Sequence, residues 1–212
     1  EEEAFSTLRE AEEQGLEFKL VELDELREDS LCMIVSLVGG GVEEEARKKA
    51  ERFPKVVKRP GLEAVKELSK FLEEEPAAIL ASEIGAGNML VPMFVAASLG
   101  AAILDADACG RAKPEIAIST THVAGISISP LAAVTPFGDV VIVRKALNDY
   151  TAEEICRHIA VASGGICGVA RCPVRARELR AKRGAVEGSI SRCIRIGRAV
   201  REALDSGRDP VE

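Results

Sequence analysis

Four acidic side chains near the ends of two apolar segments are the strongest candidates for chemistry in this sequence. Glu83 follows the apolar run 77–81, Asp105 and Asp107 close the run that starts at Ala101, and Glu115 follows shortly after. Several carboxylates close together repel unless a cation, a proton or a substrate offsets them. The group therefore predicts a functional site, either for a divalent ion such as Mg²⁺ or Mn²⁺ or for a general acid or base.

Other polar residues beside these acids extend the candidate site. Arg111 can orient a carbonyl or carboxylate, and the turn from Gly85 to Asn88 opens a helix whose free N–H groups can hold an anionic oxygen. Thr120 and Thr121 supply hydroxyl groups shortly after the acids. We assign Glu83, Asp107, Arg111 and Glu115 to catalysis and the following residues to substrate binding: Gly85, Asn88, Asp105, Thr120 and Thr121.

Structural roles compete with each of these assignments. Asp105 can simply pair with Arg111, because ion-pair networks also gather carboxylates. Cys109 is a possible nucleophile, although a lone Cys is more often inert, and His122 fits a structural role better than a catalytic one. The triplet at 39–41 resembles a phosphate cradle, but it lacks the Walker Lys-Ser/Thr.

The acids are placed by a predicted strand, helix and strand. The apolar runs 77–81 and 101–106 are typical of strands buried on both faces. Between them, Asn88 can cap a helix that runs to Leu99. A strand, a helix and a strand in this order predict a parallel pair, and ligands of such sheets bind at the carboxyl ends of the strands.

The rest of the chain also alternates between strand and helix patterns. We expect helices at 4–15, 43–52, 62–74, 151–162 (capped by Thr151), 174–182 and 189–204. Strands are expected at 17–23, 31–37 and 166–170, with a hairpin of 131–134 and 140–145, and short strands or an extended loop at 115–121 and 125–129. The prediction is an α/β fold with a mostly parallel or mixed sheet flanked by helices and a βαβ unit at 77–107.

Composition narrows the functional class. The 212 residues carry a net charge of −7 and few aromatic residues, which disfavours nucleic acid as a partner. No apolar run is long enough to span a membrane, so we expect a cytoplasmic protein with six free cysteines, most of them buried. Abundant Glu, Lys and Arg with scarce Asn and Gln are a bias typical of thermophiles.

The central block also resembles a known family. The order and spacing of residues 83–88, 105–115 and 120–121 are similar to the S-methyl thiohydantoin desulfurase family, a former domain of unknown function associated with hydantoinase and oxoprolinase proteins. Residues 196–200 and 207–211 fit the same pattern. Family members begin with a glycine-rich segment and continue into a β-rich C-terminal domain. The resemblance implies that residues 1–212 form a single α/β domain lacking both.

Two functional hypotheses follow from the resemblance. In the first, the chain is an enzyme domain that acts on a cyclic amide, such as a hydantoin or thiohydantoin, by hydrolytic or desulfurising chemistry at the acidic cluster. In the second, it is a non-catalytic subunit or ligand-binding domain of a hydantoinase- or oxoprolinase-type assembly. Its expected partners are a small-molecule substrate and either a second copy of the chain or a hydantoinase-type protein.

Overall fold

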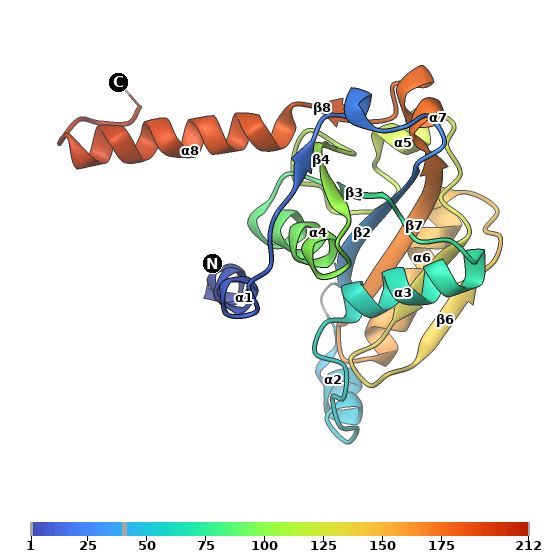
Figure 1. Cartoon of the computed structure of the whole chain (residues 1–212). Coiled ribbons are helices and arrows are strands. Elements are labelled where there is room, and N and C mark those ends of the chain that lie inside the picture. Colours follow the sequence, from blue (N-terminus) through green and yellow to red (C-terminus); the bar gives the residue numbers. More distant parts are fainter. Residues whose placement is uncertain (1, 40–41, 212) are drawn as a thin grey trace.

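The chain folds around one eight-stranded mixed sheet with helices on both faces, as predicted (Figure 1). The computed structural model describes residues 2–39 and 42–211, so most of the glycine triplet lies outside the described residues. The strand order is β1-β4-β3-β2-β7-β5-β6, and β8 pairs with β4. The strands are β1 Leu20–Val21, β2 Leu31–Gly39, β3 Ala78–Ala81, β4 Ala102–Asp107, β5 Leu131–Val134, β6 Val140–Val143, β7 Ile166–Arg175 and β8 Val186–Glu187.

The half of the sheet that carries the acids is parallel. Strands β3 and β4 are adjacent and parallel, and α4 (Ala86–Ser98) connects them, which confirms the predicted βαβ unit. Strand β2 pairs in parallel with β3, and β1 pairs in parallel with β4. The carboxyl ends of β2, β3 and β4 therefore lie side by side at one edge of the sheet.

The other half is antiparallel and is joined to the first by β7. This strand pairs with β2 on one side and with β5 on the other. Strands β5 and β6 form the predicted hairpin. Because β7 comes late in the chain yet lies in the middle of the sheet, its side chains reach the site built from β2 and β3.

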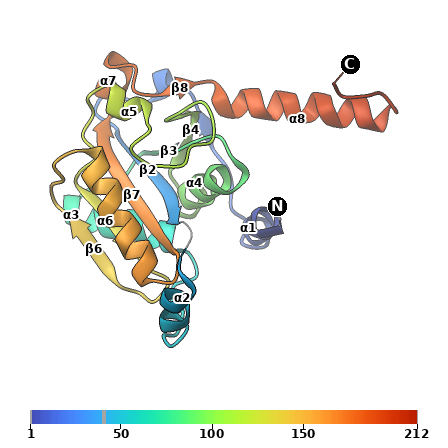
Figure 2. The ribbon, with the colours of Figure 1, turned by 180° about the vertical axis from the view of Figure 1, so that it is seen from behind.

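Helices form a layer on each face of the sheet. The two core clusters place α3 and α4 against one face and α6 and α7 against the other (Figures 1 and 2). Helix α1 packs on α4, and α8 extends away from the sheet. The helices other than α4 span the following residues: α1 Glu2–Glu13, α2 Glu44–Ala50, α3 Pro60–Leu72, α5 Thr120–Val123, α6 Asp149–Ala162, α7 Ala176–Ala181 and α8 Ser189–Asp205. Within the described residues, no helix is both long and apolar enough to cross a membrane.

Several local predictions were wrong at element boundaries. Gly85, not Asn88, is the N-cap of α4, because the Asn88 side chain is engaged in tertiary contacts. Asn148, not Thr151, is the N-cap of α6, although Thr151 completes its capping box. Strand β7 continues to Arg175, where a helix was predicted from residue 174, because pairing with β2 extends it.

Two other stretches differ from their predicted patterns. The segment predicted as a strand at 17–23 has only two strand residues and continues into a short 3₁₀-helix, Leu23–Glu25. Residues 115–121 contain the start of α5, and Ser119 caps this short helix by accepting a hydrogen bond from the Thr121 backbone. Such short segments carry too little periodicity to separate a strand from a turn.

Close packing of α3 on β7 requires a glycine at position 168. A Cβ atom there would lie 2.2 Å from the Pro60 carbonyl carbon and 2.3 Å from the Gly61 nitrogen. We expect Gly168→Ala to lower the free energy of unfolding by about 1–3 kcal/mol, because backbone atoms of α3 must shift to make room. Urea-induced unfolding followed by circular dichroism measures this change.

Gly197 provides the matched control for this substitution. It lies in α8, where an added Cβ meets no atom within 4 Å. Gly197→Ala should leave the stability unchanged or raise it by up to about 1 kcal/mol through helix propensity. Equal destabilisation by both substitutions would contradict the steric explanation.

Candidate functional site

A small polar cavity lies at the carboxyl edge of the parallel strands, where the sequence predicts a site. This edge pocket has a volume of about 190 Å³. Its lining comes from the end of β2, the residues that follow β3, the first turn of α4, the loop after β4 and one side of α6. The lining residues are Ser36, Leu37, Val38, Gly39, Ser82, Glu83, Asn88, Lys113, Pro114, Glu115, Ile116, Glu153 and Arg157.

The loop after β4, residues 108–116, is held by three carboxylates from the end of β4, the turn after β3 and helix α6. We call it the edge loop. Asp107 accepts hydrogen bonds from the Cys109 and Gly110 backbones, Glu83 accepts one from Lys113, and Glu153 accepts one from Ile116 at 2.6 Å. A hydrogen bond to a carboxylate oxygen is stronger than a hydrogen bond between two neutral groups. The acids at this edge therefore fix the path of the edge loop.

Asp107 is the most deeply placed of these acids. Its side chain is 0% exposed, and Oδ1 accepts the Cys109 N–H at 2.7 Å. The same oxygen accepts the N–H of Gly110, whose φ of +77° suits glycine. Asp107 is not among the residues that line the edge pocket. Its contacts are those of a positioning residue at the base of the loop.

Glu83 joins the edge loop to the first turn of α4. One of its oxygens accepts a hydrogen bond from Asn88 Nδ2 at 2.6 Å, and the other accepts the Lys113 N–H. Asn88 Oδ1 in turn accepts the Leu37 N–H at 3.0 Å, which ties the pair to β2. Both Glu83 oxygens therefore already have protein donors, although the residue lines the pocket.

Lys113 is the basic residue that the loop delivers to the pocket. Its Nζ is buried, and among the described residues it has no hydrogen-bond partner. Burial, followed by the positive charge of Arg171, lowers the pKa of Lys113 to about 8. Lys113 is therefore a group that can give or accept a proton near neutral pH.

Arg171 is a second cation close to this position. It lies on β7, is 1% exposed, and donates to Ser36 Oγ at 3.0 Å and to Ser82 Oγ at 2.8 Å. Both serines line the edge pocket. Burial lowers the pKa of Arg171, and among the described residues its side-chain partners are the two serines, with no carboxylate in an ion pair. A buried guanidinium without a paired anion places a fixed positive charge next to the pocket.

Glu115 differs from the anchoring acids in having a free carboxylate. It is half-buried and lines the pocket two residues after Lys113. Within the described part of the chain, its side chain has neither a hydrogen bond nor an ion pair. By contrast, Glu153 lies 2.6 Å from Arg157 Nε. Glu115 is thus the pocket acid available to a ligand.

The structure places the other predicted site residues away from the pocket. Arg111 is exposed, and its Nε donates to the Ala112 carbonyl. Asp105 accepts the Ser191 N–H at 2.9 Å in the first turn of α8, and among the described residues it forms no ion pair with Arg111. Thr120 donates to the Gly184 carbonyl at 2.8 Å. Gly85 is the N-cap of α4 in an extended conformation. Of the predicted catalytic group, the structure brings together Glu83 and Glu115.

The geometry does not fit the divalent ion that the acidic cluster suggested. Among residues 2–39 and 42–211, no three His, Cys, Asp or Glu side chains converge as metal ligands. The three anchoring carboxylates accept backbone N–H groups, which supply the offset that a cation would otherwise provide. We therefore assign no chemical step to a metal ion.

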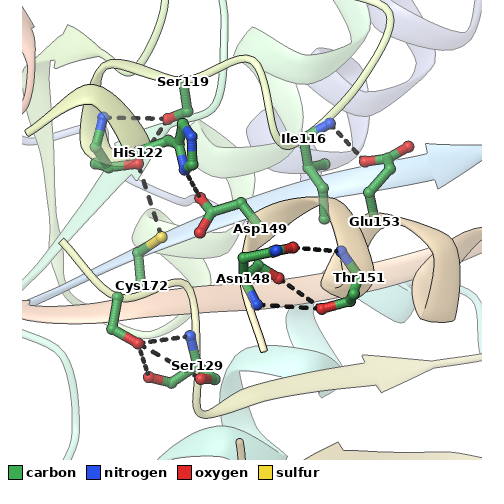
Figure 3. A network of polar contacts seen from close by, with 11 residues as sticks. Ile116, Ser119, His122, Ser129, Asn148, Asp149, Thr151, Glu153 and Cys172 are labelled. Atoms are coloured by element: carbon green, nitrogen blue, oxygen red, sulfur yellow. Dashed lines mark hydrogen bonds and ion pairs between the residues drawn. The ribbon is translucent and has the colours of Figure 1, made fainter. Parts of the chain in front are cut away.

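A separate polar network holds α5 against α6 and β7 (Figure 3). His122 Nδ1 lies 3.4 Å from the buried Asp149 Oδ2, and the His122 ring contacts Tyr150 edge-on. Thr121 shares a hydrogen bond with Ser119 at 2.6 Å and contacts the Cys172 sulfur at 3.8 Å. These side chains bind one another, which is a structural role.

The cysteines are free thiols, and four of the six are buried. Burial raises the pKa of Cys32, Cys156 and Cys167 to about 12 and also raises that of Cys172. Their thiolates are therefore scarce at neutral pH, and nucleophilic attack needs the thiolate.

Sequence reasoning missed Lys113 in the pocket and Arg171 behind its wall. For Arg171 a signal exists, since it is the one charged residue inside the apolar stretch 166–174, and a buried charge is rare unless it has a role. Lys113 has no such signal, because a lysine in a polar loop is usually solvated.

Two family models together match nearly the whole chain. The model described as the S-Me-THD-like N-terminal domain matches residues 1–145, and the model described as the S-Me-THD-like C-terminal domain matches residues 147–212. The division falls between β6 and α6. Strand β7, from the second part, nevertheless pairs with β2 and β5 from the first.

A solved structure has a similar fold. It is the X-ray crystal structure of a protein from Chromobacterium violaceum, with 27% sequence identity and a TM-score of 0.72. The match covers 88% of this chain and 50% of that protein, so the chain spans about half the length of its structural relative. A comparison with curated proteins found no match.

Proposed function

This chain belongs to the S-Me-THD-like family, and from this premise we propose that the edge pocket binds a five-membered cyclic amide of the thiohydantoin class and promotes its hydrolysis. The observation that carries the proposal is the buried, unpartnered Nζ of Lys113 in a polar pocket, beside a carboxylate that is also free among the described residues. If this edge of the sheet had only a structural role, burying the Lys113 amine would lower the stability of the fold without any benefit, because burial disfavours the charged form of the amine.

The size and charge of the pocket support this substrate class. A volume of about 190 Å³ suits a small ring, since pockets for drug-sized ligands measure about 300–1,000 Å³. Hydrolysis of a cyclic amide or thioimidate places negative charge on a ring nitrogen or oxygen in the transition state. Lys113, with Arg171 behind the pocket wall, stabilises such charge most strongly where water is excluded.

The proposed reaction for an S-methyl thiohydantoin is the replacement of the methylthio group by water. Glu115 takes a proton from the attacking water while Lys113 gives one to the ring nitrogen. The carbon–sulfur bond then breaks, and methylthiolate leaves with the proton held by Glu115. The new hydroxyl proton returns to Lys113 as the carbonyl forms. The products are a hydantoin and methanethiol, and both side chains are restored.

The first experiment measures binding and turnover together. Isothermal titration calorimetry with hydantoin, 2-thiohydantoin and an S-methyl thiohydantoin measures binding, and headspace gas chromatography measures released methanethiol. We expect the wild type to release methanethiol and Glu115→Gln to lose about 100-fold or more in rate, because general-base catalysis contributes about 10²–10⁴-fold. Substrate binding should change much less.

Glu154→Gln is the matched control. Glu154 has a side chain that is 70% exposed, lies on α6 and does not line the edge pocket. It should retain full activity. Equal activity of wild type and Glu115→Gln would contradict the role of Glu115. Binding without any turnover by the wild type would favour the alternative, a ligand-binding domain of a hydantoinase- or oxoprolinase-type assembly, over the enzyme.

A further inference from the structure

A second and larger cavity lies among α1, α3 and α4 and the segment that precedes α3. This helix pocket has a volume of about 710 Å³, within the range of small-molecule sites. It shares only Leu37 with the edge pocket. Much of its wall is apolar and includes Leu90, Val91 and Phe94. Neither the edge loop nor the anchoring acids take part in it.

Among the residues whose side chains the structure describes, the charged residues that line the helix pocket are all cations. They are Lys55, Lys58 and Arg59, which lie together just before α3. Within the described part of the chain, the acid paired with them is Glu10 on α1, which binds Arg59 Nη2 and lies 2.9 Å from Lys58 Nζ. Hydrogen bonds from Arg59 and then Lys58 lower the pKa of Glu10, so it stays ionised. Three cations against one carboxylate leave this end of the cavity positive.

Arg59 is held in a geometry that suits an anionic group beside an apolar wall. Its guanidinium lies 4.6 Å from the centre of the Phe94 ring and donates to Thr7 Oγ1 at 3.1 Å. Its Nε is buried and has no hydrogen-bond partner among the described residues. A planar guanidinium fixed in this way has a donor left for an oxygen anion.

We propose that the helix pocket binds an amphipathic carboxylate, with its apolar chain against α4 and its carboxylate at Lys55, Lys58 and Arg59. The apolar wall removes the chain from water, and the cations select its negative end. This site is independent of the edge pocket and of the reaction proposed there.

Octanoate is the test ligand, with acetate and octylamine as matched probes. Acetate keeps the carboxylate without the chain, and octylamine keeps the chain with the opposite charge. Calorimetry should detect saturable binding of octanoate and none of acetate or octylamine at the same concentrations. Binding should persist in Lys113→Met, because that residue belongs to the other pocket.

Two variants test the two parts of the site separately. Lys55→Gln/Lys58→Gln should weaken octanoate binding about tenfold or more by removing two cations. Leu90→Trp should weaken it similarly by filling the cavity, and Leu90 is half-buried and outside both core clusters. The charge-matched control is Lys48→Gln/Lys49→Gln on α2, and Ile194→Trp on α8 is the control for the added ring. Both controls should bind as the wild type does.

Three results would contradict a carboxylate site in the helix pocket. Absence of octanoate binding to the wild type, equal binding of octylamine, or unchanged affinity in both pocket variants would overturn the proposal. Circular dichroism of each variant confirms that a loss of binding is not a loss of fold.

Discussion

Lys113→Met should abolish turnover of an S-methyl thiohydantoin and, at the same time, raise the stability of the protein at pH 7. The ammonium group is the proton donor in the proposed reaction, so its loss should cost about 100-fold or more in rate. It also has no hydrogen-bond partner in the described structure, and methionine replaces it with an unbranched side chain of similar length. Removing the amine therefore removes a desolvation cost.

The pH dependence of stability provides a second readout of the same residue. The pKa of Lys113 falls from 10.5 in a free side chain to about 8 in the folded protein. Below pH 8 the amine is protonated in both states, and the folded state bears the cost of burying the charge. Between pH 8 and 10.5 the unfolded chain binds more protons, so stability rises with pH in this window.

Thermal melts of wild type and Lys113→Met across pH 6.5 to about 10.5 isolate this contribution. The variant should be more stable at pH 7 by about 3 kcal/mol at most, which is the free-energy equivalent of the pKa change. The difference should shrink as the pH rises above 8. Lys145→Met, at an exposed lysine, should show neither effect. A stability difference that does not depend on pH would contradict the buried-amine explanation.

Asp107→Ala should be the most destabilising substitution at the sheet edge. It removes the buried oxygen that accepts the N–H groups of Cys109 and Gly110, and it leaves both donors of a part-buried turn without this acceptor. Because hydrogen bonds to a charged acceptor contribute about 1.5–3 kcal/mol each, we expect a loss of about 2–4 kcal/mol. The released edge loop should also displace Lys113, so turnover should fall even though Asp107 does not line the pocket.

Asp107→Asn and Asp209→Ala separate the causes of this effect. Asparagine keeps one oxygen for the two backbone donors, so it should cost less than alanine. Asp209 also accepts a backbone N–H, from Val211 at 2.8 Å, but it is exposed, and its replacement by alanine should change stability by less than about 0.5 kcal/mol. Chemical unfolding measures all three. Equal stability of Asp107→Ala and wild type would contradict the anchoring role.

The parallel core of the fold could be predicted from the sequence because its signals are local. The apolar runs before Glu83 and before Asp107 identify two buried strands, and the helix between them requires a crossover. Because these two strands are parallel, the polar residues at their carboxyl ends lie at the same edge of the sheet. Residue order and spacing likewise indicated the S-Me-THD-like family, and the family models confirm it.

The sequence could not predict which polar residues hold the edge loop and which face the pocket, because these roles depend on contacts between distant segments. Strand β7 lies between β2 and β5, and only this pairing brings Arg171 to Ser36 and Ser82. Which acid is free depends on the path of the edge loop, since a carboxylate that accepts backbone N–H groups cannot be told from a solvated one by residue type. The strand pattern alone was enough to predict that acids gather at this edge. The folded structure was needed to see that Glu83, Asp107 and Glu153 hold the loop while Lys113 and Glu115 face the pocket. Hydrogen-bond partners are set by three-dimensional proximity and not by spacing along the chain.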